Sequence, residues 1–222
     1  MKLFLSLVLL LASLAPLQAK PSTNRFDGEI LAFEKSDATN PPPKNAILFI
    51  GSSSIRMWKT LAKDFPNHAV INRGFGGSEI TDSTHFAERV IFPYEPKLIV
   101  FYAGGNDINS GKSAELVFEN FKKFAAGLHA KLPKTRIAFI AVAGNPSRWK
   151  QLDRIRKMND SVERLAQDHP LIDFINVFPH MLGADGKPMP EIFLSDKLHM
   201  NAKGYAIWTR VIGEYLKSVP EL

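Results

Sequence analysis

The sequence of 222 residues contains no cysteine. A chain without thiols forms no disulfide, offers no thiolate to a metal ion and has no cysteine that could carry a lipid anchor. It also has no run in which basic residues alternate with aromatic ones, although its formal net charge is +6. The dispersed lysines and arginines therefore predict a solvated basic surface, and they argue against nucleic acid as a partner.

Apolar runs of the roughly 20 residues that span a bilayer are also absent. The apolar stretch from Leu3 to Leu14 is shorter, follows Lys2 and precedes the small residue Ala19. Because this order is typical of an export signal, we predict that residues 1–19 form a signal peptide that is cut after Ala19. The mature protein would be periplasmic or secreted, with no stable membrane anchor. An uncleaved anchor is the alternative.

The sequence does not indicate a metal site. Apart from His199, the histidines lack the spacing of metal ligands, and we expect them on the surface or along helices: His68, His85, His129, His169 and His180. Asp196 and His199 have no evident third ligand. We therefore predict neither a metal nor another cofactor.

Short apolar runs alternate with helical patterns from Ala46 onward, which predicts an α/β fold. The runs show little polar alternation, as is typical of parallel strands that are buried on both faces. The predicted strands are Ala46 to Ile50, Ala69 to Asn72, Lys97 to Ala103, Arg136 to Val142 and Ile172 to Val177. Apolar stripes within Val117 to Leu128 and Leu152 to Leu165 predict helices between the later strands.

The same patterns divide the chain. Residues 20–44 are predicted to be an N-terminal extension that packs outside the sheet, with a short helix from Phe26 to Asp37 and a proline-rich linker at Pro41 to Pro43. Residues 45–222 are predicted to form one domain. Irregular segments are expected at Gly104 to Ser113 and at Pro179 to Lys197. Ligands bind at the carboxyl ends of the strands in such sheets.

Serines follow the first predicted strand directly, in the order Gly51-Ser52-Ser53-Ser54, and Asp196 precedes His199 by three residues near the C-terminus. A serine hydroxyl is a poor nucleophile at neutral pH, and it needs a general base and a third group that orients the base. Asp196 and His199 can supply both from one loop. The serine turn alone also fits a phosphate-binding helix end or a simple helix cap.

Two glycine-containing loops follow the second and third predicted strands, at Asn72 to Ser78 and at Gly104 to Asp107. Acyl transfer places negative charge on a carbonyl oxygen, and donors fixed around that oxygen lower the barrier. Backbone amides in glycine loops can approach closely because no side chain obstructs them. Taken singly, each loop also fits a tight turn.

In this order, the four blocks resemble the SGNH, or GDSL-type, hydrolase family, over the chain from about residue 46 to its end. The resemblance implies a three-layer α/β/α sandwich around a mainly parallel sheet, as in flavodoxin-like folds. It implies that Ser53 is the nucleophile, His199 the general base and then acid, and Asp196 its orienting partner. It also implies an oxyanion hole made by the amides of Ser53 and Gly77 and the side chain of Asn106.

Two positions depart from the family pattern. Gly51-Ser52-Ser53 stands where Gly-Asp-Ser is usual, so three neighbouring serines compete for one role, and the position of Trp58 favours Ser53 over Ser54. Ser78 stands in place of the acidic residue that commonly follows the loop glycine. We expect this second departure to affect the support of the loop and not the reaction.

The sequence thus predicts an exported carboxylic ester hydrolase that works through an acyl-enzyme without a cofactor. No long apolar insertion is present to form a lid, which favours a short acyl group on a carbohydrate or other small ester. Lysophospholipase, thioesterase or acyltransferase activity at the same site, or a non-catalytic envelope or carbohydrate-binding role, are the alternatives. Substrate-binding residues and the oligomeric state are not indicated, and Arg148 and Trp149 fit either a pocket wall or the surface.

Overall fold

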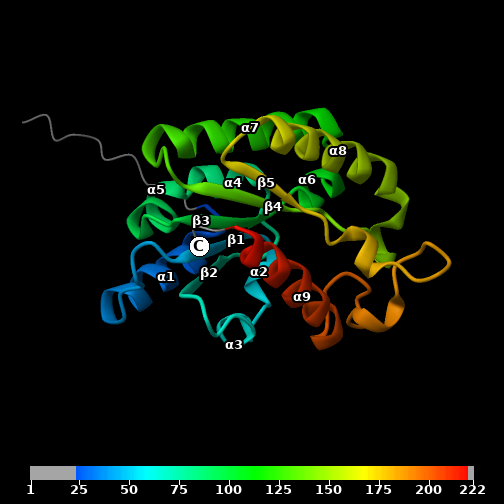
Figure 1. The fold of residues 1–222 in the computed structure, drawn as a ribbon, viewed down its shortest axis with the longest axis horizontal. Coiled ribbons are helices and arrows are strands. Elements are labelled where there is room, and N and C mark those ends of the chain that lie inside the picture. Colours follow the sequence, from blue (N-terminus) through cyan, green and yellow to red (C-terminus); the bar gives the residue numbers. More distant parts are fainter. Residues whose placement is uncertain (1–23, 220–222) are drawn as a thin grey trace, which may run out of the picture.

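A five-stranded parallel sheet forms the centre of the fold in a computed structural model that describes residues 24–219 (Figure 1). The strand order is β2-β1-β3-β4-β5, and every neighbouring pair is parallel. The strands are β1 Ile47–Gly51, β2 Val70–Gly74, β3 Leu98–Tyr102, β4 Arg136–Ile140 and β5 Ile172–Ile175. The predicted strands are confirmed, each with small shifts at its ends. The predicted signal peptide, residues 1–19, lies outside the described residues.

Helices cover both faces of the sheet, which confirms the predicted α/β/α sandwich. Figure 1 shows α7 and α8 on one side of the sheet and α3 and α9 on the other. The first face is covered by α4 Ile80–His85, α5 Ala87–Val90, α6 Gly105–Asn109, α7 Ala114–Lys131 and α8 Leu152–Asp168. The second face is covered by α2 Ser53–Arg56, α3 Leu61–Asp64 and α9 Ala202–Ser218.

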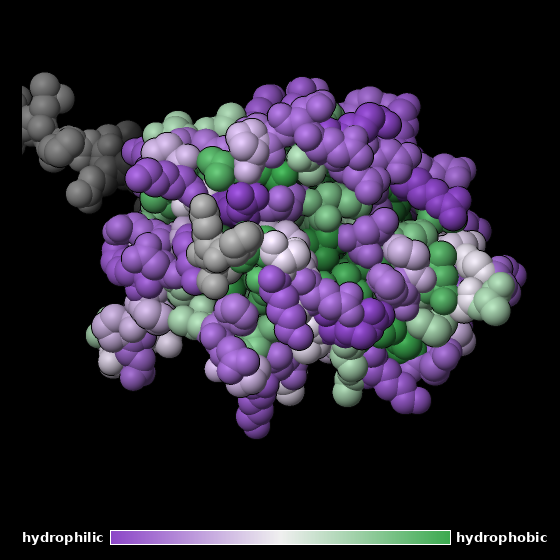
Figure 2. All heavy atoms as spheres, viewed as in Figure 1, coloured by the Kyte–Doolittle hydropathy of each residue, from purple (hydrophilic) through white to green (hydrophobic). Residues whose placement is uncertain are grey.

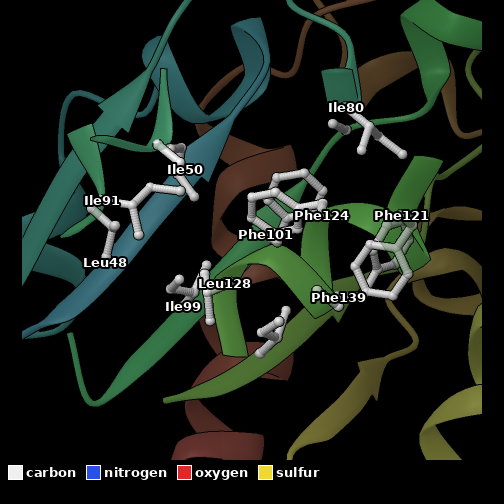
Figure 3. Close-up of a cluster of buried hydrophobic side chains, with 14 of the residues drawn as sticks. Leu48, Ile50, Ile80, Ile91, Ile99, Phe101, Phe121, Phe124, Leu128 and Phe139 are labelled. Atoms are coloured by element: carbon white, nitrogen blue, oxygen red, sulfur yellow. The ribbon is translucent and has the colours of Figure 1, made fainter. Parts of the chain in front are cut away.

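Alternate residues of each strand point to opposite faces and build two separate hydrophobic cores. On the α7 and α8 face, Phe101 of β3 stacks on Phe124 of α7 with ring centroids 4.5 Å apart, and Leu48 of β1 lies in the same cluster (Figure 3). On the α9 face, Phe49 of β1 meets the ring of Trp58 edge to face. Because both faces are buried, the strand sequences are almost continuously apolar.

The two long helices agree with the predicted apolar stripes. The side chain of Ser113 accepts a hydrogen bond from the Leu116 amide and so caps the start of α7. The outer surfaces of α7 and α8 are largely hydrophilic, as Figure 2 shows. Each helix therefore buries one stripe against the sheet and exposes the opposite face.

Several shorter elements differ from the prediction. The segment Gly104 to Ser113 is not wholly irregular, because it contains α6. The segment Pro179 to Lys197 overlaps one short 3-10 helix, Phe178–Met181, and contains another, Pro190–Ile192. Elements of three to five residues are too short to show a periodic apolar stripe, so the sequence pattern did not reveal them.

The predicted N-terminal helix is present as α1 (Asp27–Thr39). At its start, Phe26 is buried and meets Phe75 with ring centroids 5.1 Å apart. Near its end, Asp37 forms an ion pair with the guanidinium of Arg73 on the edge strand β2. The helix thus lies outside the sheet and still contributes to the core of one face. Among residues 24–219, no helix is long and apolar enough to cross a membrane.

Candidate active site

Ser53 follows β1 at the carboxyl end of the sheet and is the first residue of α2. The turn before it is tight. Gly51 has φ of +137°, and a Cβ at this position would lie 2.0 Å from the carbonyl oxygen of Tyr102 on β3. The amide of Ser52 donates to the same oxygen at 2.9 Å. Only glycine fits this approach, so Gly51 fixes the backbone immediately before Ser53.

Ser53, His199 and Asp196 form one hydrogen-bonded chain, although 146 residues separate the serine from the histidine. Oγ of Ser53 lies 2.9 Å from Nε2 of His199, and Nδ1 of that ring lies 2.6 Å from Oδ2 of Asp196. Neither Ser52 nor Ser54 forms a side-chain hydrogen bond with His199 in the described part of the chain. The geometry therefore selects Ser53 from the three neighbouring serines.

Asp196 is held as an anion by donors from its own loop. Its Oδ1 accepts from the amides of Leu198 and His199, both at 2.9 Å. The hydrogen bond from the His199 ring is the main cause that lowers the pKa of Asp196 to about 2, with the side chain 46% exposed. Because an ionised carboxylate only accepts, the proton sits on Nδ1 of His199, and Nε2 is left to accept from the Ser53 hydroxyl.

The loop after β2 carries Gly77, whose φ of +76° favours glycine. Asn72 anchors the start of this loop, since its Nδ2 donates to the Ile55 carbonyl at 2.7 Å and its Oδ1 accepts from the Gly74 amide at 2.9 Å. Within residues 24–219, the amides of Ser53 and Gly77 donate no hydrogen bond. Two backbone donors are therefore available where β1 and β2 end.

Asn106 lies at the start of α6, after β3, and its carboxamide is fixed from both sides. Its Nδ2 donates to the Ser78 carbonyl at 2.9 Å, and its Oδ1 accepts from Nη1 of Arg148 at 3.0 Å. A carboxamide nitrogen has two hydrogens. The contact with Ser78 uses one, which leaves a second donor at the same end of the sheet.

Asp107 is a buried carboxylate that links the loop after β2 to the loop after β3, a role that the sequence did not reveal. Its Oδ2 accepts from the Ile80 amide at 3.2 Å, and Nζ of Lys112 lies 3.4 Å from Oδ1. Lys112 also pairs with Glu79, the residue immediately before α4. Burial is the main cause that raises the pKa of Asp107. The sequence signal that could have indicated this role is a charged residue directly after Asn106.

Two side chains from the N-terminal segment hold the Gly77 loop, and no sequence pattern indicated this role. Both carboxylate oxygens of Glu29 lie 3.3 Å from the Gly76 amide, and Nη2 of Arg25 donates to the Gly77 carbonyl at 3.1 Å. Nη1 of Arg56, on α2, lies 3.8 Å from Glu29. The first described helix therefore reaches a loop at the carboxyl end of the sheet.

Arg148 and Trp149 lie on a 3-10 helix, Pro146–Gln151, that follows β4. Arg148 contacts Asn106, as described above, so it faces the site. The ring of Trp149 packs against Gly144, where an added Cβ would lie 2.8 Å from a ring carbon. The backbone amide of Ser147 donates to the Lys197 carbonyl at 3.1 Å, which links this segment to the loop of Asp196 and His199.

Metal-binding side chains do not converge in the described residues, where no group of three or more His, Asp or Glu side chains could hold an ion. A ring nitrogen of His129 lies 3.0 Å from the Thr135 carbonyl oxygen, and the ring stacks on His169 with centroids 5.4 Å apart. These two histidines take part in packing at the ends of α7 and α8.

The fold and this constellation define a protein of the SGNH hydrolase class. The chain belongs to the GDSL-like lipase/acylhydrolase family, whose family model matches residues 51–207. No curated protein matches the chain.

Solved structures share the fold. A GDSL-like lipase from Bacteroides thetaiotaomicron is 20% identical, with a TM-score of 0.71 over 85% of this chain and 97% of that one. A lipase/acylhydrolase from Enterococcus faecalis is 18% identical, with a TM-score of 0.65 over 77% and 94%. A variant of an acetyl-xylooligosaccharide esterase from Geobacillus is 12% identical, with a TM-score of 0.62 over 78% and 94%.

Proposed function

We propose that the protein is an exported serine ester hydrolase in which Ser53 is the nucleophile, His199 the general base and acid, and Asp196 the group that orients His199. The observation that carries this proposal is the unbroken chain of hydrogen bonds, 2.9 Å from Ser53 to His199 and 2.6 Å from His199 to Asp196. A neutral imidazole that accepts from a serine hydroxyl and donates to a carboxylate is the arrangement that activates this nucleophile.

The reaction has two halves. Oγ of Ser53 attacks the ester carbonyl carbon while its proton passes to Nε2 of His199. The oxyanion accepts hydrogen bonds from the amides of Ser53 and Gly77 and from Nδ2 of Asn106. The carbon–oxygen bond to the alcohol then breaks, and the alcohol leaves with the proton from His199. Water gives a proton to His199 and attacks the acyl-enzyme. The bond between the acyl carbon and Oγ of Ser53 then breaks, His199 returns the proton to Oγ, and the acid is released.

The substrate that we propose is a short-chain acyl ester, with an acetylated carbohydrate as the leading candidate. The site is open to solvent, since the Asp196 side chain is 46% exposed and that of His199 is 20% exposed. An open site supports a polymer or a sugar as the substrate. The likeness in fold to an acetyl-xylooligosaccharide esterase agrees with this candidate. Lysophospholipids, thioesters and transfer to a sugar acceptor are the alternatives that a substrate screen separates.

A screen of p-nitrophenyl esters from acetyl to dodecanoyl, run beside acetylated sugars, tests the proposal with two variants. Ser53→Ala should lower kcat by roughly 10⁴-fold or more, because it removes the nucleophile. Ser54→Ala should retain most activity, since the contact of Ser54 with the C-terminal helix uses its backbone carbonyl, which accepts from the Tyr205 hydroxyl. Both variants should keep a near-normal Tm. The opposite pattern of activity would move the nucleophile to Ser54.

Export is part of the same proposal. It rests on the order of basic, apolar and small residues in the first 19 positions. The intact mass of protein recovered from outside the cytoplasm should correspond to a chain that begins at Lys20. A mass that retains residues 1–19 would favour a membrane anchor.

A further inference from the structure

Arg148 is a half-buried cation beside the proposed oxyanion hole, and the reaction just described does not use its charge. Its Nη1 donates to Oδ1 of Asn106 at 3.0 Å and would lie 3.7 Å from a Cβ placed on Gly105. Both neighbours belong to the loop after β3 that supplies the Asn106 donor. The guanidinium therefore lies against the part of the site where the ester carbonyl has to bind.

The position of Arg148 is fixed by its backbone. Its amide donates to both Oδ1 and the carbonyl oxygen of Asn145, at 3.0 and 3.1 Å. On one side, Ser147 is tied to the loop of Asp196 and His199, and on the other, Trp149 packs against the backbone that follows β4. A side chain held between two parts of the site in this way can recognise a ligand at little cost in conformational entropy.

The charge of Arg148 has no counter-ion among residues 24–219, where no carboxylate forms an ion pair with it and its side chain makes one hydrogen bond, to Asn106. Two other arginines are compensated, since buried Arg73 pairs with Asp37, and partly buried Arg89 pairs with Glu34. Burial lowers the pKa of Arg148, which reflects the cost of keeping this charge partly out of water. A guanidinium has five N–H donors, so most of them are left for a ligand.

We propose that Arg148 binds an anionic group of the substrate, a carboxylate or a phosphate, next to the ester that Ser53 attacks. The geometry of a planar, forked donor suits both groups. This inference rests on the proposed function and narrows its substrate class to acyl esters of acidic sugars or other acidic alcohols. The formal net charge of +6 on the chain agrees with an anionic substrate.

Three acetyl esters test the proposal: 4-acetoxybenzoate carries a carboxylate, 4-acetoxyphenyl phosphate carries a phosphate, and methyl 4-acetoxybenzoate is neutral. The readout is the ratio of kcat/KM for each anion to kcat/KM for the neutral ester, compared between variants so that intrinsic reactivity cancels. Arg148→Ala should lower at least one ratio by about 10-fold or more, as expected for the loss of a charged hydrogen bond. The anion with the larger drop identifies the preferred group.

Lys150→Ala is the matched control, because Lys150 is an exposed cation on the same 3-10 helix. It should leave both ratios unchanged. If Arg148→Ala slows all three esters equally, Arg148 only orients Asn106 and the proposal is overturned. If Lys150→Ala lowers the ratios as much as Arg148→Ala, the positive electrostatic potential of the surface explains the preference for anionic esters, and the proposal is again overturned.

Binding without turnover separates this inference from the proposed function. Calorimetry measures the Kd of 4-acetoxybenzoate and of 4-acetoxyphenyl phosphate for two proteins, Ser53→Ala and Ser53→Ala/Arg148→Ala. For at least one anion, the Kd of the Ser53→Ala protein should be lower by about 10-fold or more. Equal Kd values in the two proteins for both anions would overturn anion recognition, whatever the kinetics. If the wild-type protein hydrolysed no ester and its binding of these anions still depended on Arg148, the hydrolase proposal alone would be overturned.

Discussion

Asn106 offers the clearest test of the oxyanion hole. Asn106→Ala should lower kcat by about 10²-fold or more with a small change in KM, because the hydrogen bond to the oxyanion is made mainly in the transition state. Asn109→Ala is the control, since Asn109 is an exposed residue on the same helix and its Oδ1 accepts from Nε2 of Gln151 at 2.9 Å. Steady-state kinetics and Tm are measured on the same preparations. Normal kcat with a lowered Tm in Asn106→Ala would make Asn106 a turn residue.

The activity should also depend on pH. An imidazole ordinarily titrates between pH 5 and 8, and protonated His199 has no lone pair on Nε2 with which to take the proton of Ser53. We therefore expect kcat/KM to fall on acidification as His199 becomes protonated, with a slope of one in a logarithmic plot. A profile that is flat from about pH 5 to 8 would count against a histidine base.

Asp196 should not contribute to that loss of activity. Its pKa is lowered to about 2 in the folded protein, mainly by the hydrogen bond from His199. A lowered carboxyl pKa stabilises the fold above its unfolded value of about 3.9, and this contribution disappears as the pH falls toward the folded value. Circular dichroism at pH 5 should therefore show no loss of structure from protonation of Asp196.

At the scale of single residues, the sequence predicted the proposed catalytic groups but not the contacts that support them. The sequence could name Ser53, Asp196 and His199 through the family resemblance, and the structure brings these three side chains together. It could not assign Arg148 to the site, nor give a role to Glu29, because each acts through a contact across the fold. Such contacts depend on rotamers and on loop paths, which no spacing along the chain encodes.

Among the helices, α1 has a specific connection to the proposed oxyanion hole. Its Glu29 accepts from the Gly76 amide, next to Gly77, so loss of the carboxylate should loosen this loop. Glu29→Ala should lower kcat by roughly 2- to 10-fold with little change in KM, the range expected for one modest hydrogen bond. Steady-state kinetics with a p-nitrophenyl ester measures the change.

Glu34→Ala is the matched control on the same helix. Glu34 holds Arg89 through two hydrogen bonds, at 2.6 and 2.7 Å, and none of its hydrogen bonds reaches the Gly77 loop. It should lower Tm at least as much as Glu29→Ala and leave kcat unchanged. Equal losses of kcat in both variants would mean that α1 affects activity only through global stability.

The longer elements were predictable, and the short ones were not. Strands buried on both faces and helices of 17 or 18 residues carry patterns that a sequence displays directly, as α7 and α8 show. The five residues of α6 start from glycine and contain two asparagines, and they show neither helix propensity nor a stripe. The fold therefore places α6 through tertiary contacts, with Asp107 and Ile108 fully buried.

For the protein as a unit, the order of strands and helices was enough to predict a parallel sheet buried on both faces, and the family resemblance implied the three-layer α/β/α sandwich. A right-handed crossover between parallel strands leaves few ways to arrange such a chain. Two hydrophobic cores, one on each face of the sheet, follow from the uninterrupted apolar strands. The family match covers residues 51–207 and leaves α1 outside, although α1 packs into one of these cores.

Ser53 should react as an activated nucleophile, and labelling with a fluorophosphonate measures this reactivity at the residue itself. Attack by Oγ of Ser53 on phosphorus forms an oxygen–phosphorus bond and expels fluoride, with the serine proton passing to His199. Peptide mass spectrometry should find one adduct per chain, on Ser53, and ester hydrolysis should be lost in proportion to labelling. His199→Ala should not label at a comparable rate. A folded wild-type protein that stays unlabelled, carries the adduct on Ser52 or Ser54, or remains active when fully labelled would show that Ser53 is not the nucleophile.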